Sequence, residues 1–358
     1  MENFENWDKI KERLTALMRQ EIVDRCCVSA CIVTGQPDPY YLRDNKADSE
    51  LKKTWTDGEF LLGLYRDAFS RMKFVGDAFP SADINLGASA HAALFKGAKI
   101  RFERNSIWFD PSLTDRETQT LEVDDTDAYY NEVINCYRYL TEHTNGGFII
   151  GSPSFSGNAD ALAHLRGSEN LLIDFLSEED VLQRELELIQ TQYERVHSDV
   201  FNIVKKNNDG ASIIGWMNLW APGLLQYMQC DLSVMISTEI FNKFIMPELE
   251  RQTEFLQYSA YHLDGFEQIR HLDSILSLKK LNLIQWTHCD GQPAPYHFMD
   301  SLKRIQNAKK SLLIMCSPED APIYLENLSS KGLILQLWTD SVEKAENVVK
   351  LAEKLTHE

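Results

Sequence analysis

The sequence predicts an α/β protein whose main domain is a (β/α)8 TIM barrel. From residue 258 to the C-terminus, four short apolar runs alternate with four helical segments. Such βα units imply a parallel sheet, because each helix must return the chain to the same edge. The chain has 358 residues, a length that suits one barrel. The alternative is a doubly wound open sheet, but the sequence has neither a GxGxxG nor a GxxxxGK[ST] motif to support it.

The N-terminal half supplies a helical extension and the first strands. Residues 6–24 have apolar positions at helical spacing, so we divide the chain into an extension over 1–24 and a barrel over 25–358. The polar segment 36–57 is expected to be a long loop over the carboxyl end of the first strand. The predicted strands of this half are 26–33, 74–77, 147–154 and 212–217, and the main predicted helices are 58–72, 124–143 and 178–206, the last with Ser177 as its N-cap.

The C-terminal half has the clearest periodicity. A helix over 238–257, with Ser237 as its N-cap, precedes the apolar strand 258–265. The later strands are predicted at 281–286, 311–316 and 333–338, and the helices at 266–278, 295–308, 319–328 and 341–356. The total reaches seven or eight strands, as a barrel requires.

The composition limits which partners and which cellular compartment we expect for this protein. The net charge is −18, from 36 basic and 54 acidic residues, so a nucleic acid is not expected to bind. No apolar run approaches the roughly 18 residues that span a bilayer, and the first residues are polar and acidic. The 7 cysteines have no framework or zinc-finger spacing, which is typical of a reducing cytoplasm. We therefore expect a cytoplasmic protein without membrane or nucleic-acid partners.

Polar and aromatic residues gather where the predicted strands end. His262 and Asp264 close the strand 258–265, and Gly265 allows a sharp exit. Because they lie two apart, we expect both to reach the cavity only if alternation is lost where the strand ends. The full set at strand ends is Asp77, Trp216, Trp220, His262, Asp264, Trp286, His288, Cys289, Cys316, Gln336, Trp338 and Asp340. Strand ends converge in a barrel, so these residues predict one deep pocket with aromatic walls.

Several of these residues are of the types that commonly bind metal ions in proteins, namely histidine, cysteine and aspartate. His262 with Cys289 and Cys316 would suit zinc, whereas His262 with Asp264 and Asp340 would make a harder site. A packed thiol or a structural histidine is the alternative for each residue taken singly. Serine hydrolase chemistry has little support, since no GxSxG motif is present.

Three stretches, residues 76–102, 158–174 and 231–265, together resemble the uroporphyrinogen decarboxylase superfamily. The superfamily also contains the cobalamin-dependent methyltransferases, which move methyl groups between corrinoid proteins and thiols. The resemblance extends from about Asp24 to the C-terminus. It implies a (β/α)8 barrel with its pocket at the carboxyl ends of the strands.

The resemblance favours methyl transfer over decarboxylation. True decarboxylases carry an arginine-rich segment after the first strand, and residues 31–45 lack it, although Asp77 looks like their pocket aspartate. The thiol-directed methyltransferases hold zinc with a His-x-Cys pair and a later Cys, and His262, Asp264 and, roughly, Asp340 match these positions. Carboxylates thus replace the sulfurs. This leaves a harder metal site, a site completed by Cys289 or Cys316, or an acid–base site without metal.

The resulting hypothesis is a methyltransferase-like enzyme that transfers a methyl group to or from a corrinoid carrier. Its catalytic residues would be His262, Asp264 and Asp77, and its substrate-binding residues Trp216, Trp220, Trp286, Gln336 and Trp338. The partners implied are a small methyl donor or acceptor and a corrinoid protein, with zinc or another divalent metal as a cofactor, and a homodimer is left open. The alternatives are a decarboxylase-like lyase and a non-catalytic barrel that binds a tetrapyrrole or another small ligand.

Overall fold

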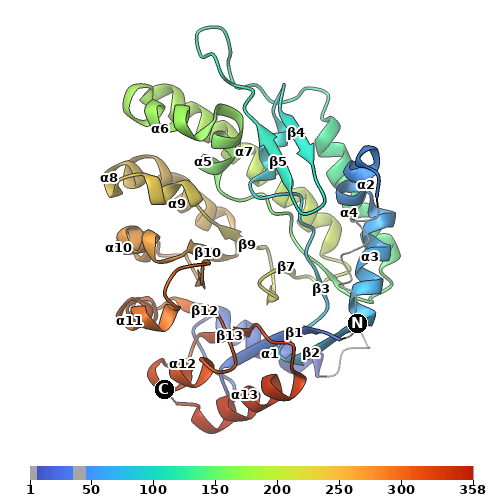
Figure 1. The fold of residues 1–358 in the computed structure, drawn as a ribbon, viewed down its shortest axis with the longest axis vertical. Helices are drawn as coiled ribbons and strands as arrows, with labels where there is room; N and C mark the ends of the chain where they lie inside the picture. Colours follow the sequence, from blue (N-terminus) through green and yellow to red (C-terminus); the bar gives the residue numbers. More distant parts are fainter. Residues whose placement is uncertain (1–5, 35–45, 358) are drawn as a thin grey trace.

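The computed structural model describes residues 6–34 and 46–357 as a mixed α/β fold around one seven-stranded sheet (Figure 1). The strand order is β2-β1-β13-β12-β11-β10-β9. All neighbours in this order are parallel except β2 and β1. The strands are β1 (Cys27–Val33), β2 (Met72–Gly76), β9 (Leu225–Met228), β10 (Tyr258–Asp264), β11 (Leu283–Thr287), β12 (Ser311–Cys316) and β13 (Leu333–Leu337). The predicted parallel sheet of βα units is therefore present.

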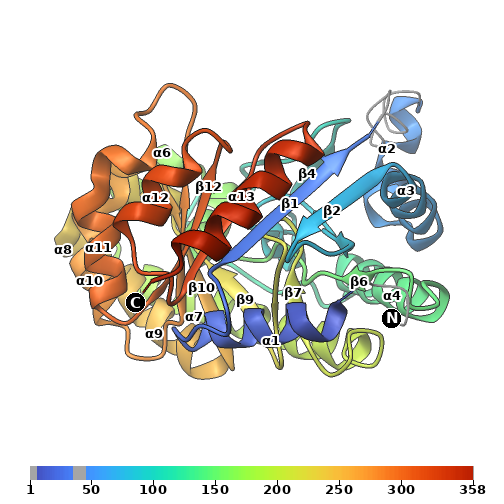
Figure 2. The same ribbon diagram turned by 90° about the horizontal axis from the view of Figure 1, so that it is seen from below.

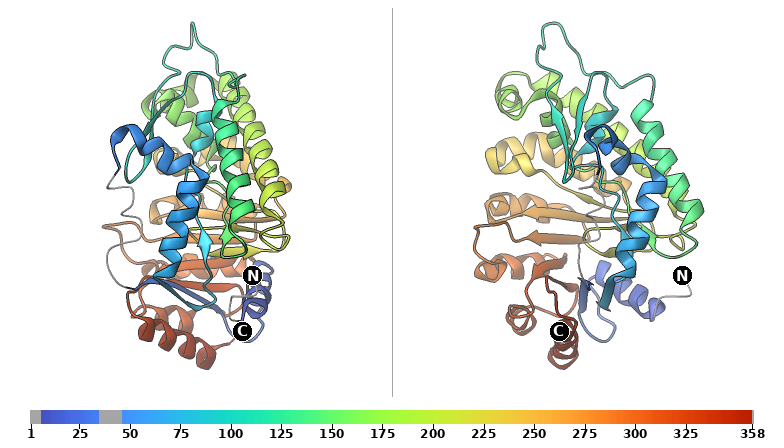
Figure 3. Two further views of the ribbon diagram at one scale, coloured as in Figure 1. Left: turned by 90° about the vertical axis from the view of Figure 1, so that its right-hand side faces the viewer. Right: turned by 45° about the vertical axis from the view of Figure 1, so that its right-hand side comes forward.

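Helices cover the outer face of this sheet, and long helices extend the molecule beyond it (Figures 1 and 3). The segments that follow the later strands are α8 (Thr238–Ile240), α9 (Met246–Phe255), η6 (Phe266–His271), α10 (Leu272–Ser277), η7 (Pro295–Phe298), α11 (Met299–Asn307), α12 (Ala321–Asn327) and α13 (Val342–Leu355). The other helices are η2 (Asp48–Glu50), α2 (Leu51–Thr56), α3 (Gly58–Ser70), η3 (Ala90–Leu94), α4 (Ala128–His143), α5 (Asn158–Arg166), α6 (Ser168–Ser177), α7 (Glu179–Val204) and η4 (Asp231–Met235).

Short strands lie between β9 and β1, where a closed barrel would complete its ring. These are β3 (Ser81–Ala82), β6 (Ile149–Ile150), β7 (Ser212–Ile214) and β8 (Leu219–Ala221). They form two small sheets, a parallel pair of β3 and β6 and an antiparallel pair of β7 and β8. A backbone hydrogen bond from Ser152 N to Ile213 O, at 2.9 Å, joins the segment after β6 to β7. The buried Asn218 side chain links β1 to this region, since its Oδ1 accepts from Ser29 Oγ at 3.0 Å. The arrangement is TIM-like, but in the part of the chain described here regular strand pairing does not close the ring.

The segment at 74–77 was predicted to be a barrel strand ending at Asp77. A strand is present there as β2, but the expectation that it runs parallel to β1 and carries Asp77 to the carboxyl ends is wrong. The strand β2 runs antiparallel to β1, with Gly76 opposite Ser29, so Asp77 lies near the beginning of β1. β2 has five residues and lies at one edge of the sheet, where it pairs only with β1. Asp77 is consequently at the opposite end of the sheet from His262.

The helix α1 (Trp7–Met18) crosses the end of the sheet where the parallel strands begin (Figure 2). Its Trp7 ring packs on Phe79 and Trp220, with ring centroids 5.2 and 6.2 Å apart. Its Arg13 forms an ion pair with Asp77 at 3.0 Å. The N-terminal extension therefore covers the amino ends of the strands.

Some of the helix caps, strands and loops predicted from local sequence are present in the structure, and others are not. Ser237 caps α8 as expected, since its Oγ accepts from Ile240 N at 3.2 Å. Ser177 caps no helix and instead donates to the Ile173 carbonyl. The hairpin of β4 (Lys99–Phe102) and β5 (Ile107–Asp110) was not predicted as strands. The expected loop at 36–57 lies partly outside the described residues, and its remainder forms η2 and α2. The stretch 31–45, where the arginine segment was sought, also lies largely outside them.

The alternation of β-strands separates two faces of the sheet. His262 on β10 lies opposite Gln285 on β11, and we call the face that bears these two residues the inner face. Leu263 and Trp286, the next pair along, point to the outer face and join the main apolar core with the helices. Within residues 6–34 and 46–357, no helix combines the length and the apolar character needed to span a bilayer.

Candidate metal centre

Three potential ligands converge where β9 and β10 end. Asp231 begins η4, directly after β9, and His262 and Asp264 belong to β10. One ligand atom from each of the three residues lies within 4.8 Å of the other two. His262 Nε2 is 3.8 Å from Asp264 Oδ1. Among the described residues this is the one cluster of three such side chains with metal-ligand spacing.

His262 and Asp264 share the inner face because residues two apart in a strand point to the same side. The strand β10 continues through Asp264, so no loss of alternation is involved. The two side chains thus lie together without any break in alternation, so the expectation that this requires the strand to end is wrong. Gly265 follows in the left-handed region at φ 81°, and a Cβ there would collide with the Gln292 side chain. Glycine is thus required for the chain to leave the strand at this point.

The His262 ring is held by two side chains of β11. Its Nδ1 donates to Gln285 Oε1 at 2.5 Å, and Gln285 Nε2 donates to Thr287 Oγ1 at 2.8 Å. The indole of Trp216 stands edge-on to the imidazole, with ring centroids 5.3 Å apart and an angle of 87°. With Nδ1 occupied as a donor, Nε2 is the nitrogen left to accept a proton or bind a metal on the side of Asp264.

The backbone of Asp231 is fixed by a second carboxylate, Asp160. The N–H groups of Asp231 and Leu232 each donate to Asp160 at 2.9 Å. Gly157 makes room for this contact, since a Cβ at that position would strike Asp160 Oδ2. Asp231 Oδ2 accepts from Gln229 at 3.0 Å, whereas its buried Oδ1 has no hydrogen-bond partner among residues 6–34 and 46–357. The site therefore presents a buried acceptor without a donor.

Burial disfavours charge in this cluster. Burial, with added repulsion from Asp160 and Asp264, raises the pKa of Asp231 to about 8. Burial also lowers the pKa of His262, although the Gln285 hydrogen bond and Asp264 oppose this shift. Near neutral pH, Asp231 is therefore largely protonated and His262 largely neutral. A bound cation would reverse the cost of ionising Asp231, because it supplies the missing positive charge.

The donor set fits a divalent metal ion. Neutral imidazole and two carboxylates are borderline-to-hard ligands, and three protein ligands leave a position for water or substrate. The unpartnered Asp231 Oδ1 is available to bind a metal ion, and the Gln285 hydrogen bond fixes the orientation of the His262 ring, as is typical of metal-binding histidines. Cys289 lies beside the cluster, with its Sγ donating to Asp264 Oδ1 at 3.1 Å. Burial and the Asp264 carboxylate raise the pKa of this thiol to about 12, so it is protonated at neutral pH.

Two predicted substrate-binding residues lie beside this cluster. Trp216 contacts His262, and Gln336 Nε2 donates to the Trp216 carbonyl at 3.0 Å from the inner face of β13. Trp338 follows β13 and is 54% exposed. Asp340 is also exposed and faces Lys344, so the structure does not bring it to His262.

The remaining candidates lie elsewhere. Trp286 faces the outer layer and packs on Phe298, with ring centroids 5.7 Å apart, because Gln285 takes the inner position of β11. Cys316 likewise lies on the outer face of β12, within the main core. Trp220 packs against Trp7 at the amino ends of the strands. The prediction that Trp286 and Cys316 surround the same cavity as His262 is therefore wrong.

Asp77 is held in a buried ion pair. It accepts from Arg25 Nη1 at 2.6 Å, Arg13 Nη1 at 3.0 Å and Val28 N at 2.9 Å. Asp77 and Arg25 are almost fully buried. These contacts join α1 to β1 and indicate a structural role, far from the cluster at the carboxyl ends.

Asp231 is the member of this cluster that sequence reasoning missed. The run at 224–230 was interpreted only as short and apolar, yet it contains β9, which pairs with β10. Had this run been assigned as a barrel strand, Asp231 would have been one more acid at a strand end. The signal was present, but a four-residue strand is too short to show a clear period.

Comparisons with known proteins identify the fold. No protein family and no curated protein matches this sequence. Nine chains of solved structure match, among them a methyltransferase from Methanosarcina mazei with a TM-score of 0.61. The alignment covers 96% of this chain and 98% of that chain, at 11% sequence identity. The two proteins therefore share their overall fold along nearly their whole length.

Proposed function

We propose that the protein is a methyltransferase-like enzyme with a divalent metal ion at Asp231, His262 and Asp264. The observation that carries this proposal is the convergence of these three side chains at the carboxyl ends of adjacent strands. In TIM-like folds, catalytic residues come from that end. The shared fold with a methyltransferase of known structure points to the same reaction class. The resemblance to the superfamily that contains corrinoid-dependent methyltransferases adds independent support.

Each residue has a definable part in this proposal. Asp231, His262 and Asp264 would hold the metal, while Gln285 and Thr287 keep Nε2 of His262 facing it. A divalent metal at this position would lower the pKa of a bound thiol, so that a thiolate is present at neutral pH. Asp231 loses its proton to solvent when its carboxylate becomes a ligand. Trp216 walls the imidazole on one side and restricts access of water.

The methyl group would travel between a thiol and a corrinoid carried by a partner protein. In the thiol-forming direction, the sulfur bonds to the methyl carbon, and the carbon–cobalt bond breaks with its electron pair remaining on cobalt. Exposed apolar side chains follow the same end of the strands, namely Met235 in η4, Phe266 after β10 and Trp338 after β13. Such side chains suit contact with a large, flat macrocycle or with the protein that carries it.

Methyl transfer from methylcobalamin to 2-mercaptoethanol tests the proposal, followed by the visible spectrum of the corrinoid. The zinc-loaded wild-type protein should demethylate the corrinoid, and Asp264→Asn should reduce the rate at least a hundredfold. Asp340→Asn is the matched control and should keep the wild-type rate, because Asp340 is exposed. No demethylation by the metal-loaded wild-type protein, with any of several small thiols, would contradict methyl transfer to thiols. Conversion of uroporphyrinogen to coproporphyrinogen would favour the lyase instead.

A further inference from the structure

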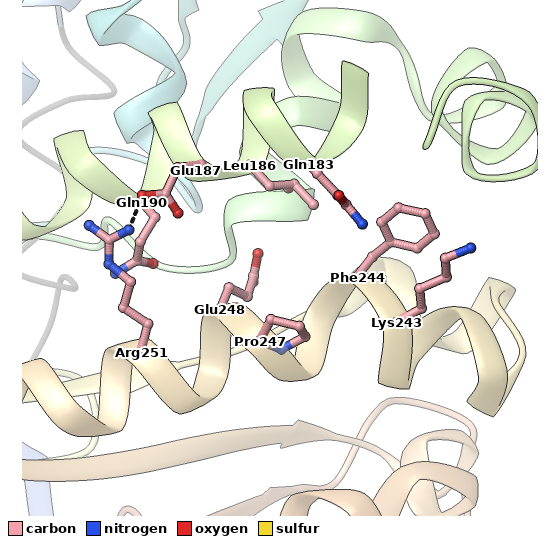
Figure 4. A pocket seen from close by; sticks show the side chains of 9 residues that line it. All are labelled: Gln183, Leu186, Glu187, Gln190, Lys243, Phe244, Pro247, Glu248 and Arg251. Atoms are coloured by element: carbon pink, nitrogen blue, oxygen red, sulfur yellow. Dashed lines mark hydrogen bonds and ion pairs between the residues drawn. The ribbon is translucent and has the colours of Figure 1, made fainter. Parts of the chain in front are cut away.

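A cavity of about 220 Å³ lies between α7 and α9, apart from the metal centre (Figure 4). Its walls are apolar where Leu186 of α7 faces Phe244 and Pro247. A π-helical turn, η5 (Phe241–Ile245), precedes α9 and ends two residues before Pro247. Proline has no N–H to donate to a regular helical hydrogen bond. Such π-helical turns are frequent at functional sites, because they displace side chains from regular helical positions. The cavity therefore has a specific shape and not merely loose packing.

Glu248 of α9 points into this space, toward α7 (Figure 4). The residue is 6% exposed. Beyond a weak approach by the Asn158 backbone N–H, neither of its carboxylate oxygens has a hydrogen-bond partner among the described residues. The Oε1 atom of the neighbouring Gln252 is also buried without a partner. A buried carboxylate without donors costs several kcal/mol, so a site with this geometry favours a ligand that brings donors.

The charged residues at the rim do not satisfy Glu248. Arg251 pairs with Glu187 and with Glu194, the latter at 2.6 Å, and Lys243 pairs with Glu179 at 2.6 Å. Each of these basic side chains is thus already paired with an acidic side chain of α7. Glu248 thus has no basic partner among the residues at the rim, and a positively charged ligand would stabilise its ionised form.

The shape of the site indicates an organic cation and not a metal ion. Glu248 belongs to no group of three metal-ligating side chains at ligand distance among the described residues. The cavity is instead bounded by the aliphatic Leu186 and the aromatic Phe244, which favour contact with carbon atoms. An ammonium group can donate to Glu248 while its alkyl chain contacts these walls.

We propose that the cavity between α7 and α9 binds a small primary ammonium compound, with Glu248 as the charge partner. Burial and repulsion by Asp160 raise the pKa of Glu248 well above its usual range, so its carboxyl group carries a proton when no cation is bound. An ammonium ligand replaces this proton. The other titratable or charged groups near the carboxyl are Tyr193, Cys230, Tyr261, Lys243, Glu187 and Arg251.

Isothermal titration calorimetry at pH 7.5 tests this site, with n-butylammonium chloride as the probe. Wild-type protein should bind it saturably with a Kd on the order of 1 mM, typical of so small a ligand. n-Butanol and sodium butyrate, which match its chain without a positive charge, should bind at least tenfold more weakly. Equal binding of all three compounds, or no saturable binding of the ammonium compound, would overturn the proposal.

Glu248→Gln keeps the side-chain size and removes the charge, and it should weaken butylammonium binding at least tenfold. Glu250→Gln is the matched control, since Glu250 is exposed on the same helix, and it should bind as the wild type does. Circular dichroism verifies that each variant is folded. Leu186→Phe, which fills the cavity without changing charge, provides a second test and should also weaken binding. Wild-type affinity in Glu248→Gln, or in a folded Leu186→Phe, would overturn the assignment.

Discussion

Replacing Asp77 by Asn should destabilise the protein without altering its chemistry. The substitution leaves the buried Arg25 guanidinium without the carboxylate that accepts from it at 2.6 Å. Breaking a buried ion pair on one side typically costs about 3–5 kcal/mol. For a chain of 358 residues, this corresponds to a decrease in Tm of roughly 4–7 °C. Urea denaturation followed by circular dichroism measures the loss of free energy of unfolding directly.

Asp24→Asn is the matched control for Asp77→Asn, because Asp24 pairs with the same Arg13 but is 42% exposed. A pair with one half-exposed partner contributes less than a fully buried one, so this variant should lose clearly less free energy of unfolding than Asp77→Asn does. After correction for the folded fraction, metal binding by Asp77→Asn should be unchanged. Wild-type stability combined with lost metal binding or activity would refute the structural assignment and return Asp77 to the active site.

Three further predictions follow from individual contacts. Burial lowers the pKa of His197 to about 4, so the unfolded chain takes up its proton first as the pH falls, and stability is lost. Between pH 7.5 and 5, the wild type should lose about 2 kcal/mol more than His197→Gln in urea denaturation, and parallel pH profiles would contradict this. Ser237→Ala should cost about 1 kcal/mol and Ser177→Ala much less, because only Ser237 caps a helix; equal losses of free energy of unfolding would contradict the capping assignment. Gln285→Leu should weaken Zn²⁺ affinity about 10–100-fold in a competition titration with a chelator, because His262 loses its orienting acceptor, and unchanged affinity would remove Gln285 from the site.

Most of the parallel sheet could be predicted because its strands are apolar and follow helices at short intervals. The strand at 311–316 was predicted to the residue. The short strands β3 and β8 could not be predicted, since two or three residues show no period. The direction of β2 could not be predicted from the sequence either, because apolar content does not distinguish a parallel strand from an antiparallel one.

For the site, the sequence shows which residues lie near the ends of strands. It does not show which face of the sheet each side chain occupies. His262 and Asp264 are two apart and share a face, which the pattern of a strand requires. Trp286 and Cys316 also lie near strand ends, yet each is one residue out of phase with the inner face. Which alternate residues point inward depends on the register with neighbouring strands, which pairing fixes and the local sequence does not. Asp231 reaches the cluster because it follows β9 and because its backbone N–H donates to the Asp160 carboxylate. This contact between distant residues could not be predicted from the sequence.

Metal binding tests the central claim most directly, because it needs no knowledge of the substrate. Protein stripped with a chelator should bind one equivalent of Co²⁺ in a titration followed by visible absorption. Asp231→Asn, His262→Ala and Asp264→Asn should each lower the affinity at least a hundredfold while the fold is retained. Cys316→Ser and Asp340→Asn should bind as the wild type does, since neither residue lies in the cluster. Absence of binding by the wild type, or full binding by Asp231→Asn, would contradict a metal centre built from these three residues.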